Sequence, residues 1–361
     1  MTVNRIIRSL SGVVLICALA VWWRLSVSHD PLDNVIEDFL LENDLPGAVV
    51  AVAMPGEDVD LRAYGLADFD TGRAMQVTDR FRFASLSKPL TATAILRAGS
   101  GTSDFTIDSP VSAVLPEFAD AYDPRAAEIT LRHLLQHSAG WDSARDLPPF
   151  FTSSEVLAGE LGLDYDATTN CRPLADAMLK RGLQHDPGTQ YAYSNLGYCW
   201  LGLWLEAYMN TPYQDAVARL VPEAAPLSLD AMDVTVMHRG LADSEPLLAL
   251  DPLVIAAAGG WIGTAADFAA FATQEIDPLT LERPVYAPQG QFYGLGWRVW
   301  PGKDAHVLLT HYGSKPGVFS LVVRTLDGRA IVALFNGRPR EDLPAFRSLF
   351  VGLAGLKQFS F

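Results

Sequence analysis

Segments with the character of β-strands lie at both ends of this chain, and this distribution constrains the fold more than any other feature of the sequence. Near the N-terminus, the apolar run 48–54 and the segment 59–64 are separated by a Pro-Gly turn, which is typical of a hairpin. The C-terminal part contains further strand-like segments with turn signals between them: 294–300, 306–311, 318–324 and 330–336. Strands at both ends with helices between them predict an α+β fold, in which one antiparallel sheet is assembled from the two termini.

Short helices and loops dominate the middle of the chain, so we expect a mostly helical region, about 97–284, inserted between the two halves of the sheet. Within it, Thr130 is placed to cap a short helix, and an apolar helical stretch ends near Tyr208. Outside it, Asp30-Pro31 is typical of a helix start, and a final amphipathic helix is expected from about Leu343 to Leu353.

The first 29 residues have the features of a targeting or anchoring segment. Arg5 and Arg8 precede an apolar run from Leu10 to Trp23, as in a secretory signal peptide. With its flanking residues the run approaches the length of a membrane span, and Ser26-Val27-Ser28 is a weak cleavage site, so we favour an uncleaved anchor over a cleaved signal. Either alternative places residues 30–361 outside the cytoplasm, on the periplasmic side of the inner membrane or secreted.

Charge and cysteine content exclude several classes of partner. The chain has 42 acidic and 27 basic residues, a net charge of −15 and no basic run, which argues against a nucleic-acid partner. No Cys-x-x-Cys occurs, so we expect neither a structural zinc site nor a cofactor. Cys171 and Cys199 are able to form a disulfide in an exported protein, but the sequence leaves this open.

Ser85-Leu86-Ser87-Lys88 opens an apolar segment that runs to Leu96. If this segment is helical, Ser85 and Lys88 lie on the same face, one turn apart. A serine hydroxyl becomes a good nucleophile when a nearby base takes its proton, and the amino group of Lys88 is able to do so. The N–H groups at a helix N-terminus would also favour an oxyanion beside Ser85. The alternative is a chance pair with Lys88 in solvent.

Two further motifs follow in order, Tyr193-Ser194-Asn195 in the helical region and His311-Tyr312-Gly313 at the end of a strand. With Ser-x-x-Lys, this arrangement resembles the penicillin-recognising serine hydrolases, whose three motifs line one active site. The tyrosine in the second motif and the histidine in the third narrow this resemblance to the class C β-lactamase-like branch of the family. That branch includes esterases, D-amino-acid peptidases and carboxypeptidases. The stretches 134–140, 258–260 and 293–297 also resemble that branch.

The resemblance implies a β-lactamase/transpeptidase-like fold over residues 30–361 and a role for each motif residue. Ser85 would be the acylated nucleophile, and Lys88 would lower its proton affinity or shuttle its proton. Tyr193 would act as general base, which is reasonable if nearby cations stabilise its phenolate. Asn195 would hold Lys88 and the substrate amide, although it is also a candidate N-cap for the helix that follows.

The backbone N–H groups of Ser85 and Ser314 would form the oxyanion hole. For the third motif, Lys315-Pro316-Gly317 is an alternative to the motif that begins at His311 and ends at Gly313. We prefer the latter, because proline lacks the N–H that a substrate-binding strand edge needs. The resemblance makes the stretch around His137 structural, although His133 and His137 are also possible catalytic groups.

The resulting prediction is a serine hydrolase that acts through an acyl-enzyme on small carboxylic esters or on amides and peptides that contain D-amino acids. His311 favours substrates without an obligatory carboxylate, since histidine is largely neutral at pH 7, although the nearby Lys315 weakens this argument. The alternatives are a class C-type β-lactamase or D-Ala-D-Ala carboxypeptidase and, more remotely, a catalytically silent binding or sensor module. The oligomeric state stays open.

Overall fold

A computed structural model describes residues 30–100, 105–143, 159, 171–239, 252–302 and 306–356. The expected signal peptide or anchor, residues 1–29, lies outside the described residues. Within the described ranges, no helix combines the length and the apolar character that crossing a membrane requires.

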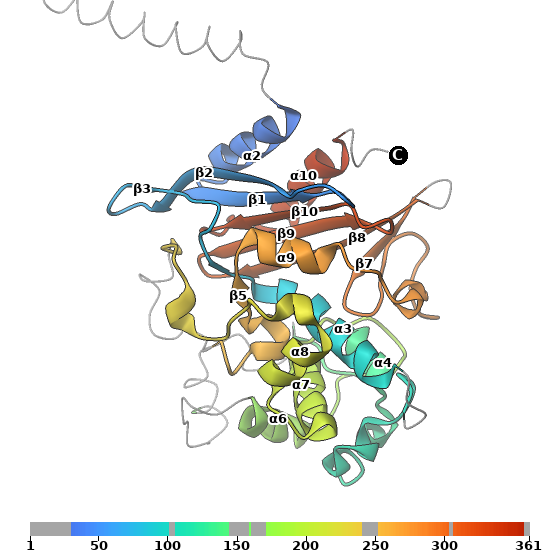
Figure 1. The fold of residues 1–361 in the computed structure, drawn as a ribbon. Coiled ribbons are helices and arrows are strands. Elements are labelled where there is room, and N and C mark those ends of the chain that lie inside the picture. The colour runs from blue at the N-terminus through green and yellow to red at the C-terminus, as the bar shows by residue number, and fades with distance from the viewer. Residues whose placement is uncertain are drawn as a thin grey trace, which may run out of the picture.

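One antiparallel sheet, with the strand order β3-β2-β1-β10-β9-β8-β7-β6, joins the two ends of the chain and confirms the predicted architecture (Figure 1). The contact between the ends is the pair β1–β10, in which Val50 lies opposite Ala333. The strands are β1 Gly47–Ala53, β2 Asp60–Asp68, β3 Arg73–Ala74, β6 Phe292–Tyr293, β7 Arg298–Pro301, β8 Val307–Lys315, β9 Val318–Thr325 and β10 Ala330–Phe335. A separate short pair consists of β4 Phe81–Arg82 and β5 Ile262–Gly263.

Helices cover both faces of the sheet. α2 (Pro31–Glu42) and α10 (Asp342–Ala354) lie on one face, and α9 (Ala265–Ala272) with the helical region lies on the other (Figure 1). Because β1 is buried on both faces, alternate residues enter different cores, Val49 on the side of the helical region and Val50 under α2 and α10. This explains why β1 is a continuous apolar run rather than an alternating one.

Helix starts follow the expected capping chemistry. The Asp30 side chain accepts a hydrogen bond from Leu32 N at 2.9 Å and begins α2. Thr130 and His133 form a capping box at the start of α4 (Leu131–Leu135). α3 (Ser87–Gly99) leads into the inserted region, whose further α-helices include α6 Arg172–Leu179, α7 Asn195–Met209 and α8 Tyr213–Leu220.

Two expected strands differ from the structure. The segment predicted as 306–311 continues to Lys315, so the third motif lies inside β8 rather than at its end. The segment predicted as 294–300 is interrupted, because Gly294 N donates to Trp297 O and Gly296 has a φ of +78°. A side chain at Gly296 would also meet the Ala92 side chain of α3 at 2.4 Å, so the loop between β6 and β7 approaches α3 too closely for a regular strand.

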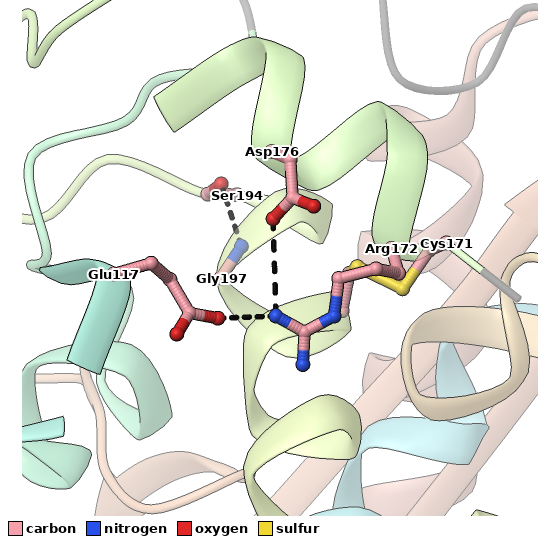
Figure 2. The surroundings of a disulfide bond; sticks show 7 residues. Glu117, Cys171, Arg172, Asp176, Ser194 and Gly197 are labelled. Carbon is pink, nitrogen blue, oxygen red and sulfur yellow. Dashed lines mark hydrogen bonds and ion pairs between the residues drawn. A yellow bond between two sulfur atoms is a disulfide. The ribbon is translucent and has the colours of Figure 1, made fainter. Parts of the chain in front are cut away.

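Cys171 and Cys199 form a disulfide, with 6.2 Å between their Cα atoms, which answers the question that the sequence left open. Figure 2 shows its surroundings: the bridge ties the start of α6 to α7, and the neighbouring Arg172 forms ion pairs with Glu117 and Asp176. Since Cys199 lies one helical turn after Asn195, the bridge also anchors the first turns of α7.

Replacing both cysteines by serine is expected to lower the free energy of unfolding. The bridge closes a loop with a sequence separation of 28 residues, and its loss restores conformational entropy to the unfolded chain. A loop of this size predicts a loss of about 3–4 kcal/mol. Denaturant unfolding of the Cys171→Ser/Cys199→Ser protein measures it, with the reduced wild-type protein as a control. Equal unfolding midpoints for the oxidised and reduced wild type would contradict this prediction.

Candidate active site

Ser85 lies on a sharp bend between β4 and α3. The preceding Ala84 has a φ of +49°, a left-handed conformation that costs on the order of 1–3 kcal/mol for a residue with a side chain. Surrounding hydrogen bonds hold this bend: Ser87 Oγ donates to Ala84 O at 2.8 Å, and Ser320 Oγ donates to Phe83 O at 2.7 Å. The bend presents the Ser85 hydroxyl at the start of α3.

Lys88 is completely buried and lies on the same side of the bend as Ser85. Its Nζ is 2.6 Å from Ala258 O, 2.7 Å from Asn195 Oδ1 and 3.2 Å from Ser85 Oγ. Burial lowers the pKa of Lys88 well below its ordinary value. In a neutral amine, the two N–H groups serve the two closer acceptors and the lone pair faces the Ser85 hydroxyl. Lys88 is therefore arranged as a proton acceptor for Ser85.

Tyr193 lies on the other side of the same hydroxyl, with its OH 2.9 Å from Ser85 Oγ. Burial raises the pKa of Tyr193 well above its ordinary value, and this effect outweighs the opposing effect of the hydrogen bond between Tyr193 and Ser85. The low-dielectric surroundings therefore favour the neutral phenol in the resting site, so a phenolate stabilised by a cation is expected only during turnover. A neutral Tyr193 donates to Ser85 Oγ while Ser85 donates to Lys88, so all three groups are satisfied.

His137 holds the second motif in place from behind. Its Nδ1 accepts from Ser194 N at 3.2 Å, and its ring lies 4.3 Å from the Tyr193 ring. No contact between His137 and Ser85 occurs among the described residues, so the structure gives His137 a positioning role. The N-cap of α7 is Ser194, whose Oγ accepts a hydrogen bond from Gly197 N (Figure 2). Asn195 is therefore not the cap, and its side chain contacts Lys88 instead.

The free edge of β8 faces Ser85. β7 pairs with β8 only as far as Thr310, so residues 311–315 have an unpaired edge on that side within the part of the chain that the structure describes. At Gly313, a Cβ atom would lie 2.5 Å from Phe83 O and 2.9 Å from Ser85 N. The absence of a side chain there lets β8 approach the backbone N–H of Ser85, and the next residue, Ser314, lines the same cavity as Ser85.

His311 is buried and neutral at this edge. Its Nδ1 lies 2.9 Å from Tyr312 O, and its Nε2 lies 2.8 Å from Tyr293 OH. The carbonyl can only accept, so Nδ1 carries the proton and Nε2 accepts from the Tyr293 hydroxyl. Burial and the nearby Lys88 lower the pKa of His311 well below its ordinary value. His311 therefore supplies no positive charge to a ligand.

A cavity of about 540 Å³ opens over these groups and is partly lined by Ser85, Tyr193, His311 and Ser314. Motif reasoning missed three contributors: Arg298 in the cavity wall, Tyr293 as the partner of His311, and the carbonyl of Ala258 as an acceptor for Lys88. Two of them fall within stretches that the sequence marked, 258–260 and 293–297, and Arg298 directly follows the second. Among the described residues, no cluster of histidine, cysteine, aspartate or glutamate is suited to a metal ion.

The sequence of this chain is similar to those of known proteins. The family described as Beta-lactamase matches residues 32–355. Esterase EstB of Burkholderia gladioli is 35% identical over 212 residues, which cover 55% of this chain but only 49% of the esterase. The match thus spans about half the length of that relative.

Solved structures share the whole architecture. EstCE1, a hydrolase with promiscuous acyltransferase activity, superposes with a TM-score of 0.70 at 21% identity and covers 90% of this chain and 98% of its own. The D-stereospecific amidohydrolase from Streptomyces sp. gives a TM-score of 0.68 at 21% identity, with 90% and 99% covered. These similarities confirm the predicted β-lactamase/transpeptidase-like fold.

Proposed function

This chain belongs to the beta-lactamase family, and we propose that it is a serine hydrolase that forms an acyl-enzyme on Ser85 with carboxylic esters or amides of D-amino acids. The observation that carries the proposal is the position of the Ser85 hydroxyl, 3.2 Å from Lys88 Nζ and 2.9 Å from Tyr193 OH. A nucleophile in contact with both a neutral amine and a neutral phenol has an acceptor for its proton and a donor for the leaving group.

In acylation, Lys88 takes the proton of Ser85 as Oγ attacks the substrate carbonyl carbon. The N–H groups of Ser85 and Ser314 stabilise the oxyanion that forms. Tyr193 gives its phenolic proton to the leaving group as the bond to the carbonyl carbon breaks. Lys88 now carries a proton, and its Nζ lies 4.9 Å from the centre of the Tyr193 ring, so its charge stabilises the phenolate left behind.

Deacylation reverses these transfers. The Tyr193 phenolate takes a proton from a water molecule whose oxygen attacks the acyl carbonyl carbon. The ester bond to Ser85 then breaks, and Lys88 returns its proton to Oγ. The products are a carboxylic acid and the original neutral forms of Ser85, Lys88 and Tyr193. The cation that favours a phenolate therefore arises during turnover rather than in the resting site.

Gly313→Ala is expected to lower kcat about 10²–10³-fold, the usual effect of losing an oxyanion-hole donor. The added methyl would lie 2.5 Å from both Phe83 O and Ser320 Oγ, so β8 must move away from Ser85. Steady-state hydrolysis of a p-nitrophenyl ester measures the effect. Gly159→Ala is the control, because that glycine is helical and exposed and nothing lies within 4 Å of the added methyl. Wild-type kcat in the Gly313 variant would show that the close approach of β8 is dispensable.

The substrate proposal follows from His311 and is supported by the esterase relative. A neutral His311 offers no permanent cation beside the nucleophile, which suits esters and amides without an obligatory carboxylate. The test is a panel of p-nitrophenyl esters, D-aminoacyl amides and nitrocefin, combined with labelling by a fluorophosphonate probe. A fluorophosphonate adduct on Ser85 with turnover of esters or D-aminoacyl amides supports the proposal, and absence of labelling would favour a silent binding module.

A second candidate, a class C-type β-lactamase or D-Ala-D-Ala carboxypeptidase, is favoured by Arg298. This residue lines the cavity, and its guanidinium donates to Gln291 Oε1 at 2.7 Å. This partner is a neutral amide rather than a carboxylate, so the charge of Arg298 is available to a substrate carboxylate. Rapid nitrocefin turnover, or release of D-alanine from a D-Ala-D-Ala peptide, would favour this candidate over the first.

We also propose that the hydrolase domain is exported. The disulfide Cys171–Cys199 supports export, because structural disulfides persist mainly in oxidising compartments. Mass spectrometry of the mature N-terminus distinguishes the two alternatives for residues 1–29. A mature chain that starts at His29 would show cleavage, and an intact N-terminus in the membrane fraction would show an anchor.

A further inference from the structure

Lys315, the last residue of β8, has no assigned role in the proposed mechanism. It is only 5% exposed, and it lines the same cavity as Ser85. Its amino group forms no hydrogen bond or ion pair with any described residue. A cation that is removed from water without a counter-charge costs free energy, so packing alone does not explain a lysine at this position.

No carboxylate is paired with Lys315 among the described residues. The carboxylate in the cavity wall, Asp342, is already paired with Arg338 and accepts a hydrogen bond from Ser314 Oγ. His238 lies beside the turn after β8, where its Nδ1 is 3.0 Å from Gly317 O and its Nε2 is 3.4 Å from Arg82 N. Burial lowers the pKa of His238 to about 3, so this residue is neutral. Burial, together with the nearby Arg82 guanidinium, lowers the pKa of Lys315 well below its ordinary value. A bound anion would raise that pKa again and hold Lys315 as an ammonium, because it supplies the opposite charge that these neighbours lack.

The positions along β8 indicate which part of a substrate reaches Lys315. Tyr193, the proposed proton donor to the leaving group, packs against His137, and His137 packs against Tyr293, the partner of His311. The leaving group therefore lies toward His311. Lys315 lies on the other side of Gly313, about 7 Å further along the strand. A chain attached to the acyl carbonyl would run in that direction.

We propose that Lys315 binds an anionic group, such as a carboxylate, at the end of the acyl portion of the substrate. The assignment to the acyl portion rests on the proposed function, because it depends on Tyr193 as donor to the leaving group. It extends that function by naming a substrate class: esters or amides of short dicarboxylic acids or of acidic acyl groups, attacked at the uncharged end.

The test compares mono-p-nitrophenyl glutarate with p-nitrophenyl pentanoate, which differ in the terminal carboxylate, after subtraction of spontaneous hydrolysis. We expect the wild-type kcat/KM to favour the glutarate at least about tenfold, the usual range for a charge-assisted hydrogen bond. Lys315→Met should reduce that preference by about 10–100-fold. Lys180→Met, at an exposed lysine that caps the end of α6, is the matched control and should keep the preference. Thermal unfolding verifies that each variant is folded.

A binding measurement separates failure of this inference from failure of the proposed function. In Ser85→Ala protein, calorimetry compares the p-nitroanilides of glutaric and pentanoic acid, so no turnover is needed. Tighter binding of the glutaric derivative, lost in Ser85→Ala/Lys315→Met, supports the anion site even if neither ester is hydrolysed. Equal affinity for the two anilides, or a preference unchanged by Lys315→Met, would overturn it.

Discussion

Ser85→Ala protein is expected to lose at least about 10⁴-fold in kcat, because the acyl-enzyme cannot form without the hydroxyl and the remaining groups only bind and polarise the substrate. The ester with the highest kcat/KM in the substrate panel is the appropriate reporter. Intact-protein mass spectrometry after fluorophosphonate treatment provides a second measurement, in which the wild type gains one adduct and the variant gains none.

The neighbouring Ser87 provides a matched control for this substitution. Its hydroxyl is buried, but it donates to Ala84 O and accepts from Trp261 N at 3.2 Å, so its contacts are structural. Because this hydroxyl supports the bend but does not react, Ser87→Ala should lower the activity far less than Ser85→Ala does, and it should lower the free energy of unfolding by about 1–3 kcal/mol, the cost of unsatisfied buried groups. Undiminished hydrolysis by Ser85→Ala, or inactivity of only the Ser87 variant, would show that Ser85 is not the nucleophile.

Local patterns were sufficient to predict the architecture. The apolar run 48–54 and the strand-like segments 318–324 and 330–336 correspond to β1, β9 and β10. The N-cap signal at Asp30 and the amphipathic pattern after Leu343 correspond to α2 and α10. The interruption of the segment 294–300 depends instead on contact with α3 across the fold, and no local preference encodes it. The extension of β8 to Lys315 depends on pairing with β9, where Lys315 lies opposite Val318.

Only those residues of the candidate site that belong to a sequence motif could be predicted. Ser85, Lys88, Tyr193 and Asn195 come from distant segments, and the structure brings them into contact. Arg298 has no motif of its own, and its place in the cavity depends on how β7 pairs with β8.

The protonation state of Tyr193 in the resting site could not be predicted from the sequence. A sequence shows that a lysine and a tyrosine share a site, but it does not show how completely the site is buried. The structure shows that burial is the dominant influence on both groups, lowering the pKa of Lys88 and raising that of Tyr193. Desolvation favours the uncharged form of each group, so the resting pair is neutral rather than an ammonium beside a phenolate.

The activity is expected to depend on pH through Lys88. Acylation needs the neutral amine, so kcat/KM should fall about tenfold for each pH unit below the Lys88 pKa and should reach a plateau above it. Because burial lowers the pKa of Lys88 well below its ordinary value, the plateau begins at a lower pH than an exposed lysine would allow. The raised pKa of Tyr193 keeps the phenol protonated across that plateau. Initial rates at constant ionic strength, with a stability check at each pH, measure the profile.

Substitutions of Lys88 distinguish a base from a mere cation. Lys88→Met should lower kcat/KM about 10²–10⁴-fold, the usual contribution of general base catalysis, and should remove the acid limb of the profile. Lys88→Arg keeps a positive charge and hydrogen-bond donors, but the guanidinium does not release its proton at any ordinary pH. If Lys88 accepts the Ser85 proton, the arginine variant is as inactive as the methionine variant. Near-wild-type activity in the arginine variant, with the fold verified by circular dichroism, would assign Lys88 an electrostatic role and leave Tyr193 as the base.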